Sequence, residues 1–182
     1  MKKGIVFIMF SLCINVPLFS QEVCSIEDLV EFQNLMEGCS GLTNQAKSNY
    51  EKARPSIEGI AQRNGFTMYE YHYVNGNLGQ GEMSSYCCFL YKNCKISKDE
   101  HSYPTFTPTK SGVSCVIDKG YIQVYNKNTF NELVQKIKER CGNKVYSYTE
   151  DEEEIHYYYD GKYCFWINYG YTIGIRKKQY FM

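Results

Sequence analysis

The sequence predicts an α+β protein: short N-terminal helices, then two units that each contain a helix and an antiparallel four-stranded sheet, stapled by disulfide bonds. Apolar residues recur at helical spacing within 26–65 and again within 129–142. Aromatic and polar residues alternate with period two in the segments that follow. A hydrophobic fraction of 43% and an aromatic fraction of 16% are enough for a core and exclude a disordered chain.

The segment 1–20 has the features of a secretory signal peptide. A basic start, Met1-Lys2-Lys3, precedes an apolar run that ends at the small residue Ser20. We predict cleavage near Ser20, which leaves one secreted domain over 21–182, with halves over 21–126 and 127–182. The short basic start is typical of bacteria and predicts a periplasmic or secreted location. Because the apolar run is shorter than the ~20 residues that cross a bilayer, we expect no transmembrane anchor.

Cleavage also changes the charge and the cysteine count. The 20 basic and 20 acidic residues become 18 against 20 when Lys2 and Lys3 leave, and this near-neutrality argues against a nucleic-acid partner. Nine cysteines become eight when Cys13 leaves, and we expect them to form up to four disulfides of open connectivity in an oxidising compartment. The disulfide candidates are Cys24, Cys39, Cys87, Cys88, Cys94, Cys115, Cys141 and Cys164.

Three parts of the chain carry helix signals. Ser25 is the expected N-cap of a first helix that ends at Gly38. A second helix is expected to begin near Thr43, and Pro55 either interrupts it or starts a third helix that stops at Gly65. A capping box at Thr129 to Glu132 predicts the helix that Gly142 ends.

The strand signals follow each helical region. Residues 67–74 alternate and lead to a turn at Asn75-Gly76, followed by a second strand over 84–91. Residues 92–112 are polar and predict a long loop pinned by Cys94. A hairpin is expected over 113–125, with its turn at Asp118-Lys119-Gly120. The remaining strands form a predicted four-stranded meander over 144–148, 155–159, 163–168 and 172–176.

The two halves show a possible internal repeat at an offset of 77 residues. Seven of the 34 positions from 57 to 90 are identical to the residue 77 positions later, without a gap. A tandem repeat is one interpretation, and a similar order of helix and strand signals in a Tyr-rich chain is the other. The paired segments that stand out are Arg63-Asn64-Gly65 with Arg140-Cys141-Gly142, and Tyr86-Cys87 with Tyr163-Cys164.

On these paired segments, the plan of two helix-plus-sheet units with disulfide support resembles the β-lactamase inhibitory protein family. The likeness covers most of the mature chain in plan, but 23–41 and 92–112 depart from it. The resemblance implies a secreted protein that grips another protein with its concave sheet. Small periplasmic immunity proteins, which neutralise antibacterial toxins, fit the same description. No binding residue is carried over from either group.

The sequence shows no motif of a known hydrolase or metal site. It contains neither G-x-S-x-G nor H-E-x-x-H, and we expect no catalysis and no cofactor. A zinc site formed by Cys87, Cys88, Cys94 and a histidine is an alternative to disulfides, but the spacing lacks paired C-x-x-C. The acidic run 150–154 is interpreted as a solvated hairpin, a patch for a basic partner or a calcium site.

The most informative feature of the composition is its high tyrosine content, with 18 residues. Some rings belong to the core, but tyrosine is also enriched at recognition surfaces because it combines a large contact area with a polar tip. We expect a non-catalytic immunity or inhibitor protein that occludes a toxin or enzyme, with a glycan-binding envelope module or a hydrolase with an unrecognised site as alternatives. The expected partner-binding residues are Tyr69, Tyr71, Tyr73, Glu152, Glu153, Glu154, Tyr157, Tyr159 and Trp166.

Overall fold

The computed structural model describes residues 23–77, 79, 81–98, 103–110, 112–142, 145–150 and 153–177. The predicted signal peptide lies outside these residues and stays a prediction. The helices of the described part are α1 (Ile26–Met36), α2 (Thr43–Asn64) and α3 (Lys127–Cys141). Its strands are β1 (Ser40–Leu42), β2 (Thr67–Asn77), β3 (Glu82–Lys92), β4 (Cys94–Ser97), β5 (Thr105–Pro108), β6 (Cys115–Asp118), β7 (Tyr121–Val124), β8 (Val145–Glu150), β9 (Glu153–Tyr159), β10 (Tyr163–Asn168) and β11 (Thr172–Lys177).

The helix ends follow local chemistry, with two corrections. Ser25 caps α1 as predicted, since its hydroxyl accepts the N–H of Asp28 at 3.0 Å. The prediction for Pro55 was wrong: α2 is one helix of 22 residues with this proline inside it and exposed to solvent. The predicted capping box at Thr129 was also wrong, because Asn126 is the cap and accepts the N–H of Thr129 at 3.1 Å.

The strands of both halves join one nine-stranded sheet, so the prediction of two separate four-stranded units was wrong. The order is β1-β3-β6-β7-β11-β10-β9-β8, with β2 on the other edge of β3, and all these pairs are antiparallel. The 77-residue offset equates β2 with β8 and β3 with β10. However, β2 pairs directly with β3, whereas β9 separates β8 from β10. The pairing of β7 with β11 closes the two halves into a continuous sheet.

Two further local predictions changed in the structure. The predicted loop over 92–112 contains a ribbon of β4 and β5, in which Cys94 pairs with Pro108 and Ile96 with Phe106. The predicted turn at Asn75-Gly76 lies inside β2, where a bulge between Val74 and Gly76 shifts the register. In both segments, hydrogen bonds to a partner strand override the local turn signals.

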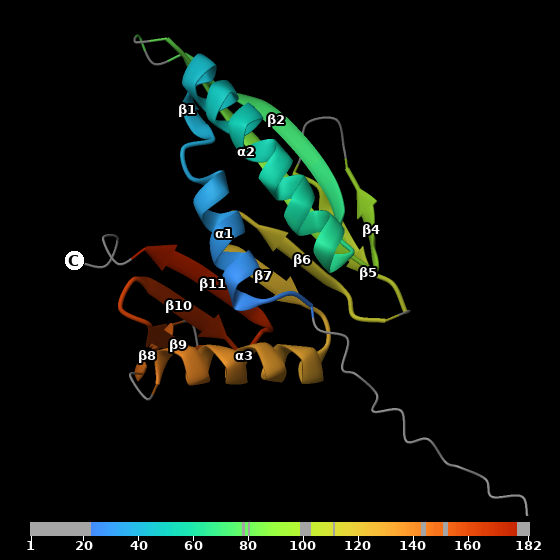
Figure 1. Ribbon diagram of the computed structural model, residues 1–182, viewed down its shortest axis with the longest axis vertical. Coiled ribbons are helices and arrows are strands. Elements are labelled where there is room, and N and C mark those ends of the chain that lie inside the picture. The colour runs from blue at the N-terminus through green and yellow to red at the C-terminus, as the bar shows by residue number, and fades with distance from the viewer. Residues whose placement is uncertain are drawn as a thin grey trace, which may run out of the picture.

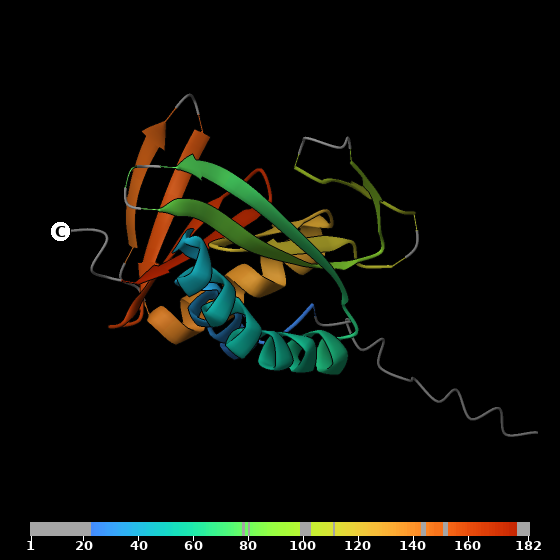
Figure 2. The same ribbon diagram turned by 90° about the horizontal axis from the view of Figure 1, so that it is seen from above.

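All three helices cover the same face of the sheet, which places the core in one layer between them. Figure 2 shows the helices beneath the sheet, with the β4–β5 ribbon and the β8–β9 hairpin rising on the opposite side. Figure 1 shows α2 running along β2 and α3 crossing below β7, β10 and β11. The largest fully buried side chains include Phe32 of α1, Phe130 of α3 and Phe165 of β10. The opposite face of the sheet carries no helix and is covered in part by the ribbon.

The structure contains no disulfide among its described residues, so the disulfide-stapled fold is not supported. The eight cysteines concerned are Cys24, Cys39, Cys87, Cys88, Cys94, Cys115, Cys141 and Cys164. Most are buried, and burial raises the pKa of the Cys88 thiol to about 12. The thiol of Cys94 donates to main-chain carbonyls of Lys92 and Cys115. Buried thiols of this kind act as small apolar core groups.

Among the helices of the described residues, none is both long enough and apolar enough to cross a bilayer.

Candidate functional site: the open face of the sheet

The strand registers show which residues occupy the face opposite the helices. In β3, Cys88 and Leu90 belong to the core beneath the helices, so Cys87 and Phe89 point the other way. Tyr69 and Tyr71 of β2 lie opposite Phe89 and Cys87 in the register and therefore share that face. We call this surface, away from α1, α2 and α3, the open face.

The structure brings six of the predicted binding residues together on the open face, although it takes them from three strands. Tyr157 pairs with Trp166, and Tyr159 with Cys164. The intervening Phe165 and Ile167 of β10 belong to the core. Since side chains alternate along a strand, these aromatic residues point away from the helices. The six are Tyr69, Tyr71, Tyr73, Tyr157, Tyr159 and Trp166.

A cluster of three tyrosines forms one end of the open face. Tyr71 and Tyr73 of β2 stack with ring centroids 5.8 Å apart, and Tyr103 contacts both at 5.9 and 5.6 Å. The hydroxyl of Tyr103 donates to that of Tyr73 at 2.7 Å. Tyr103 remains 53% exposed, so the cluster presents rings whose positions are set by one another. Such prearranged aromatic surface lowers the entropy cost of binding.

Trp166 forms a flat platform nearer the middle of the sheet. Its cross-strand partner on β11 is Gly174, and a Cβ atom built there would lie less than 3.0 Å from the indole ring. The indole therefore lies directly against the backbone of Gly174. A glycine inside a strand marks this kind of close approach. The Nε1, Cε2 and Cζ2 atoms of the ring occupy the space that a side chain at position 174 would fill, and the residue remains partly exposed for contact with a ligand.

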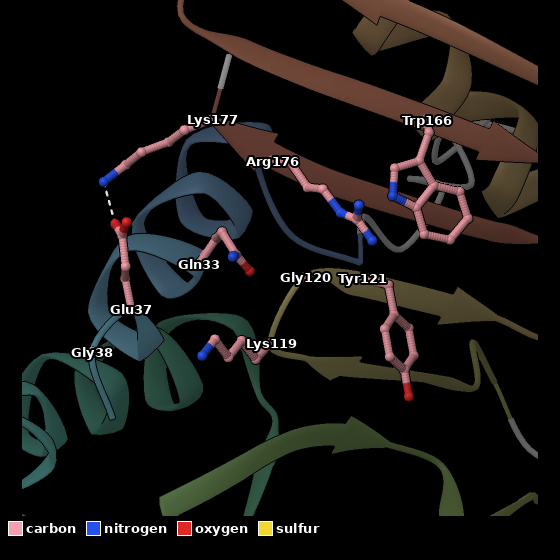
Figure 3. A pocket seen from close by; sticks show the side chains of 9 residues that line it. All are labelled: Gln33, Glu37, Gly38, Lys119, Gly120, Tyr121, Trp166, Arg176 and Lys177. Carbon is pink, nitrogen blue, oxygen red and sulfur yellow. Dashed lines mark hydrogen bonds and ion pairs between the residues drawn. The ribbon is translucent and has the colours of Figure 1, made fainter. Parts of the chain in front are cut away.

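Trp166 borders a pocket of about 590 Å³, which lies within the volume range of ligand sites. The pocket lies where β7 begins and β11 continues past it, beside the C-terminal end of α1 (Figure 3). We call it the Trp166 pocket. Its lining residues are Gln33, Glu37, Gly38, Lys119, Gly120, Tyr121, Trp166, Arg176 and Lys177.

Two cations in the Trp166 pocket have no ion pair within the described part of the chain. Lys177 pairs with Glu37, but no carboxylate of these residues lies within ion-pair distance of Lys119 or Arg176. Figure 3 shows the Arg176 side chain directed toward Trp166 and Tyr121, and the Lys119 side chain directed toward the end of α1. Two positive charges that lack an ion pair, lining a pocket with an indole and the Tyr121 ring, suit an anionic group.

Glu154, the predicted acidic residue whose side chain the structure describes, does not lie on the open face. Glu152 lies outside the described residues, as does the side chain of Glu153. Glu154 is exposed, and its Oε1 lies 2.9 Å from Nε2 of His156. Glu154 and His156 alternate with Tyr157 along β9, so they point to the helical side of the strand. The structure therefore separates Glu154 from the aromatic residues with which it was grouped.

Asp118 lies beside the Trp166 pocket on the same face and has an altered acidity. Burial raises the pKa of its carboxyl from 3.8 to about 6, although the N–H of Lys119 donates to Oδ1 at 2.6 Å. A raised pKa in the folded state means that ionisation is harder there than in the unfolded chain. Stability from the protonated form is therefore complete below about pH 3.8 and declines as the pH rises toward 6.

Replacing Asp118 with asparagine is expected to stabilise the protein by about 1–3 kcal/mol at pH 7.5, since Asn keeps an acceptor for Lys119 N–H and carries no buried charge. The gain should vanish near pH 3.5, where Asp118 is protonated in both states. Urea unfolding at the two pH values measures the difference. The control is Glu51→Gln, which removes the acidic partner of the exposed ion pair with Lys47. It should change the free energy of unfolding little at either pH. An equal effect of Asp118→Asn at both pH values would contradict the assignment.

A second pocket, of about 330 Å³, lies on the helical side between α2 and β2. Its polar groups satisfy one another: Arg54 and the hydroxyl of Tyr50 both donate to Glu70 at 2.7 Å. The hydrogen bond from Arg54 and that from Tyr50 outweigh burial and lower the pKa of the Glu70 carboxyl. The His72 and Tyr86 rings stack at 4.1 Å. These contacts stabilise the packing of α2 on the sheet and leave the Trp166 pocket as the stronger candidate.

Sequence reasoning missed most residues of the Trp166 pocket. The sequence predicted Lys119 and Gly120 only as part of a hairpin turn, and Arg176 only as the end of the last strand. Gln33 was not singled out on the first helix. One sequence signal could have pointed to the pocket: Gly174 lies inside a predicted strand, and a glycine there indicates that another group lies close to the backbone.

Comparison of the chain with protein-family models, with curated proteins and with solved structures finds no match. Within the residues that the structure describes, no group of three or more His, Cys, Asp or Glu side chains is arranged to hold a metal ion. The geometry of the open face is therefore the basis for the functional proposal.

Proposed function

We propose that this chain is a non-catalytic periplasmic or secreted protein that binds another protein through the open face, as an immunity or inhibitor protein that occludes a toxin or enzyme. The observation that carries the proposal is the gathering of aromatic residues from β2, β9 and β10 on the side of the sheet without helices. Tyrosine and tryptophan are the residues that most often dominate binding energy at protein interfaces.

The shape of the sheet supports the same proposal. The β4–β5 ribbon and the β8–β9 hairpin rise from the sheet at opposite ends of the open face (Figure 2). Phe106 of the ribbon packs on Phe89 and Tyr91 at 5.3 and 5.4 Å, which anchors the ribbon on the sheet. A ribbon held in place in this way loses little conformational entropy when a partner binds beside it.

Replacing Tyr71 or Tyr73 with alanine is expected to weaken binding of the protein partner by about 2 kcal/mol or more, which is roughly 30-fold in Kd. Each substitution removes a ring and one of the contacts in the Tyr71–Tyr73–Tyr103 cluster. The partner is isolated from envelope and secreted fractions on the immobilised wild-type chain, purified, and its affinity for each variant measured by calorimetry.

The matched control is Tyr169→Ala, which removes a ring that is 46% exposed and packs against Phe130 and His156 on the helical side of the sheet. This variant should bind within about twofold of wild type, since rings outside the interface contribute little to binding energy. The proposal is wrong if Tyr71→Ala and Tyr73→Ala leave the affinity unchanged while both proteins remain folded by circular dichroism.

A second candidate function, a glycan-binding module of the cell envelope, is favoured by one observation. The indole of Trp166 packs directly against the Gly174 backbone and is partly exposed, and an exposed aromatic ring held in this way is a suitable stacking platform for a sugar. Weak saturable binding of neutral envelope oligosaccharides, lost in Trp166→Ala and kept in Tyr71→Ala, would support this function. A single tight protein partner that competes for the open face would support the first.

A further inference from the structure

We propose that the Trp166 pocket binds an acidic segment of the protein partner, with carboxylates at Arg176 and Lys119 and an apolar or planar group on the indole. This inference rests on the proposed function and specifies the partner's chemistry. It also differs from the sequence-based expectation of a basic partner, because the charges on the open face are cationic around this pocket and Glu154 points to the other side of β9.

The charges of the pocket carry the proposal. Glu37 is the acidic residue among the lining residues, and it is paired with Lys177. Arg176 and Lys119 are exposed and lack an ion pair within the described residues. Asp118 attracts Lys119 electrostatically without forming an ion pair, and its raised pKa weakens that attraction near pH 6. The pocket therefore keeps an excess of positive charge for a ligand carboxylate.

An uncompensated acceptor supports the same assignment. Oε1 of Gln33 is buried and has no hydrogen-bond partner among the described residues. It faces the position that a Gly120 side chain would occupy, at 3.9 Å from a Cβ built there. A buried acceptor without a donor costs free energy, so a donor that reaches it stabilises the complex. The main-chain N–H of an inserted segment supplies such a donor.

The balance of donors and acceptors favours a peptide over a sugar. Among the described residues, the polar groups of the lining that lack a partner are the cations of Lys119 and Arg176, the Oε1 of Gln33 and the indole N–H of Trp166. A sugar presents many hydroxyls, each of which donates a hydrogen bond, and this pocket offers few acceptors for them. An acidic segment presents mainly acceptors, which match the cations, and it extends naturally from the aromatic surface where the partner binds.

The chain has a single tryptophan, so its fluorescence reports on this pocket alone. The probe is an acetylated and amidated peptide with four consecutive glutamates, titrated into the full mature chain at about 20 mM salt and again at about 200 mM, where screening is stronger. We expect a saturable change in emission whose midpoint rises several-fold at the higher salt. The same peptide with lysines in place of glutamates should give no change.

The variant Arg176→Gln/Lys119→Gln should weaken binding of the acidic peptide at least about tenfold. Both side chains are exposed, so the fold should be kept. The matched control Lys52→Gln neutralises an exposed lysine on the outer side of α2 and should bind like wild type. The conservative change Arg176→Lys keeps the charge and should retain most of the binding.

Three outcomes would overturn the inference: no fluorescence change with the acidic peptide, equal binding by the double variant, or binding of the lysine peptide. A fluorescence change with an acidic oligosaccharide such as oligogalacturonate, without a change with the peptide, would also overturn it. That result would indicate that the pocket binds a glycan. None of these outcomes depends on Tyr71 or Tyr73. The failure of this inference is therefore distinguishable from failure of the protein-binding proposal.

Discussion

Gly174→Ala is expected to displace the Trp166 indole, destabilise the fold by about 1–3 kcal/mol and weaken binding at the Trp166 pocket at least tenfold. The alanine Cβ would overlap the indole, which rests against the Gly174 backbone. Neither residue can yield easily: Gly174 is held in β11 by pairing with Trp166 and Tyr121, and β10 is held between β9 and β11. The ring must therefore rotate away from the sheet, which removes the platform.

Tryptophan emission and urea unfolding measure this effect directly. The displaced indole is more exposed to water, so its emission should move to longer wavelength while far-ultraviolet circular dichroism stays native. A double-mutant cycle with Trp166→Ala isolates the contact, because Gly174→Ala should cost little stability once the indole is absent. Gly59→Ala in α2 is the control: its Cβ would approach only Arg63, at 3.7 Å, and it should stabilise the protein by about 0.5–1 kcal/mol. A native emission spectrum in Gly174→Ala would contradict the stacked arrangement.

Phe165→Ala is expected to cost about 3–5 kcal/mol of unfolding free energy, the largest stability effect among the predictions. Phe165 is 0% exposed on the helical face of β10, between cross-strand neighbours Tyr158 and Ile175. The guanidinium of Arg140 lies over its ring, 5.8 Å from the centroid, so the ring also supports the end of α3. Its removal leaves a cavity between helix and sheet that the surrounding strands cannot close.

Equilibrium unfolding in urea tests this prediction, and the neighbouring position tests which face is the core. Trp166→Ala, one residue along the same strand, should reduce stability much less, since the indole is partly exposed. Phe165→Leu should cost less stability than Phe165→Ala and more than Trp166→Ala, because leucine keeps most of the apolar volume of the phenylalanine side chain. If Trp166→Ala proved more destabilising than Phe165→Ala, the assignment of the open face would be reversed.

The helices and most strands could be predicted because their signals are local. The Ser25 side chain caps α1, and Gly65 ends α2 in a left-handed conformation with φ of 66°. The strand alternation that grouped Tyr69, Tyr71 and Tyr73 on one face depends only on period two. Pro55 misled the prediction because its effect was judged from the residue alone, whereas the packed apolar stripe of α2, with Tyr50, Ala53 and Ile57 buried, keeps the helix intact.

The sheet order could not be predicted from these signals. The apparent repeat suggested that each half closes its own sheet, but the decisive contact is the antiparallel pairing of β7 with β11, which are far apart in the chain. Pairing partners of that separation depend on how the buried faces fit together, and the periodicity of each strand is the same whichever neighbour it takes. The separation of Glu154 from the tyrosines follows from strand alternation and shows that closeness in sequence does not place side chains on one surface.

The sequence by itself determined that this chain is α+β, where most of its helix ends lie, and that aromatic residues occupy one face of several strands, because caps and periodicity act over a few residues. Only the tertiary structure decided that the halves share one sheet and that the aromatic residues of β2, β9 and β10 face the same side. It also decided that Lys119 and Arg176 meet Trp166 at one pocket. The physical reason is that such sites are assembled by long-range strand pairing, which no local pattern encodes.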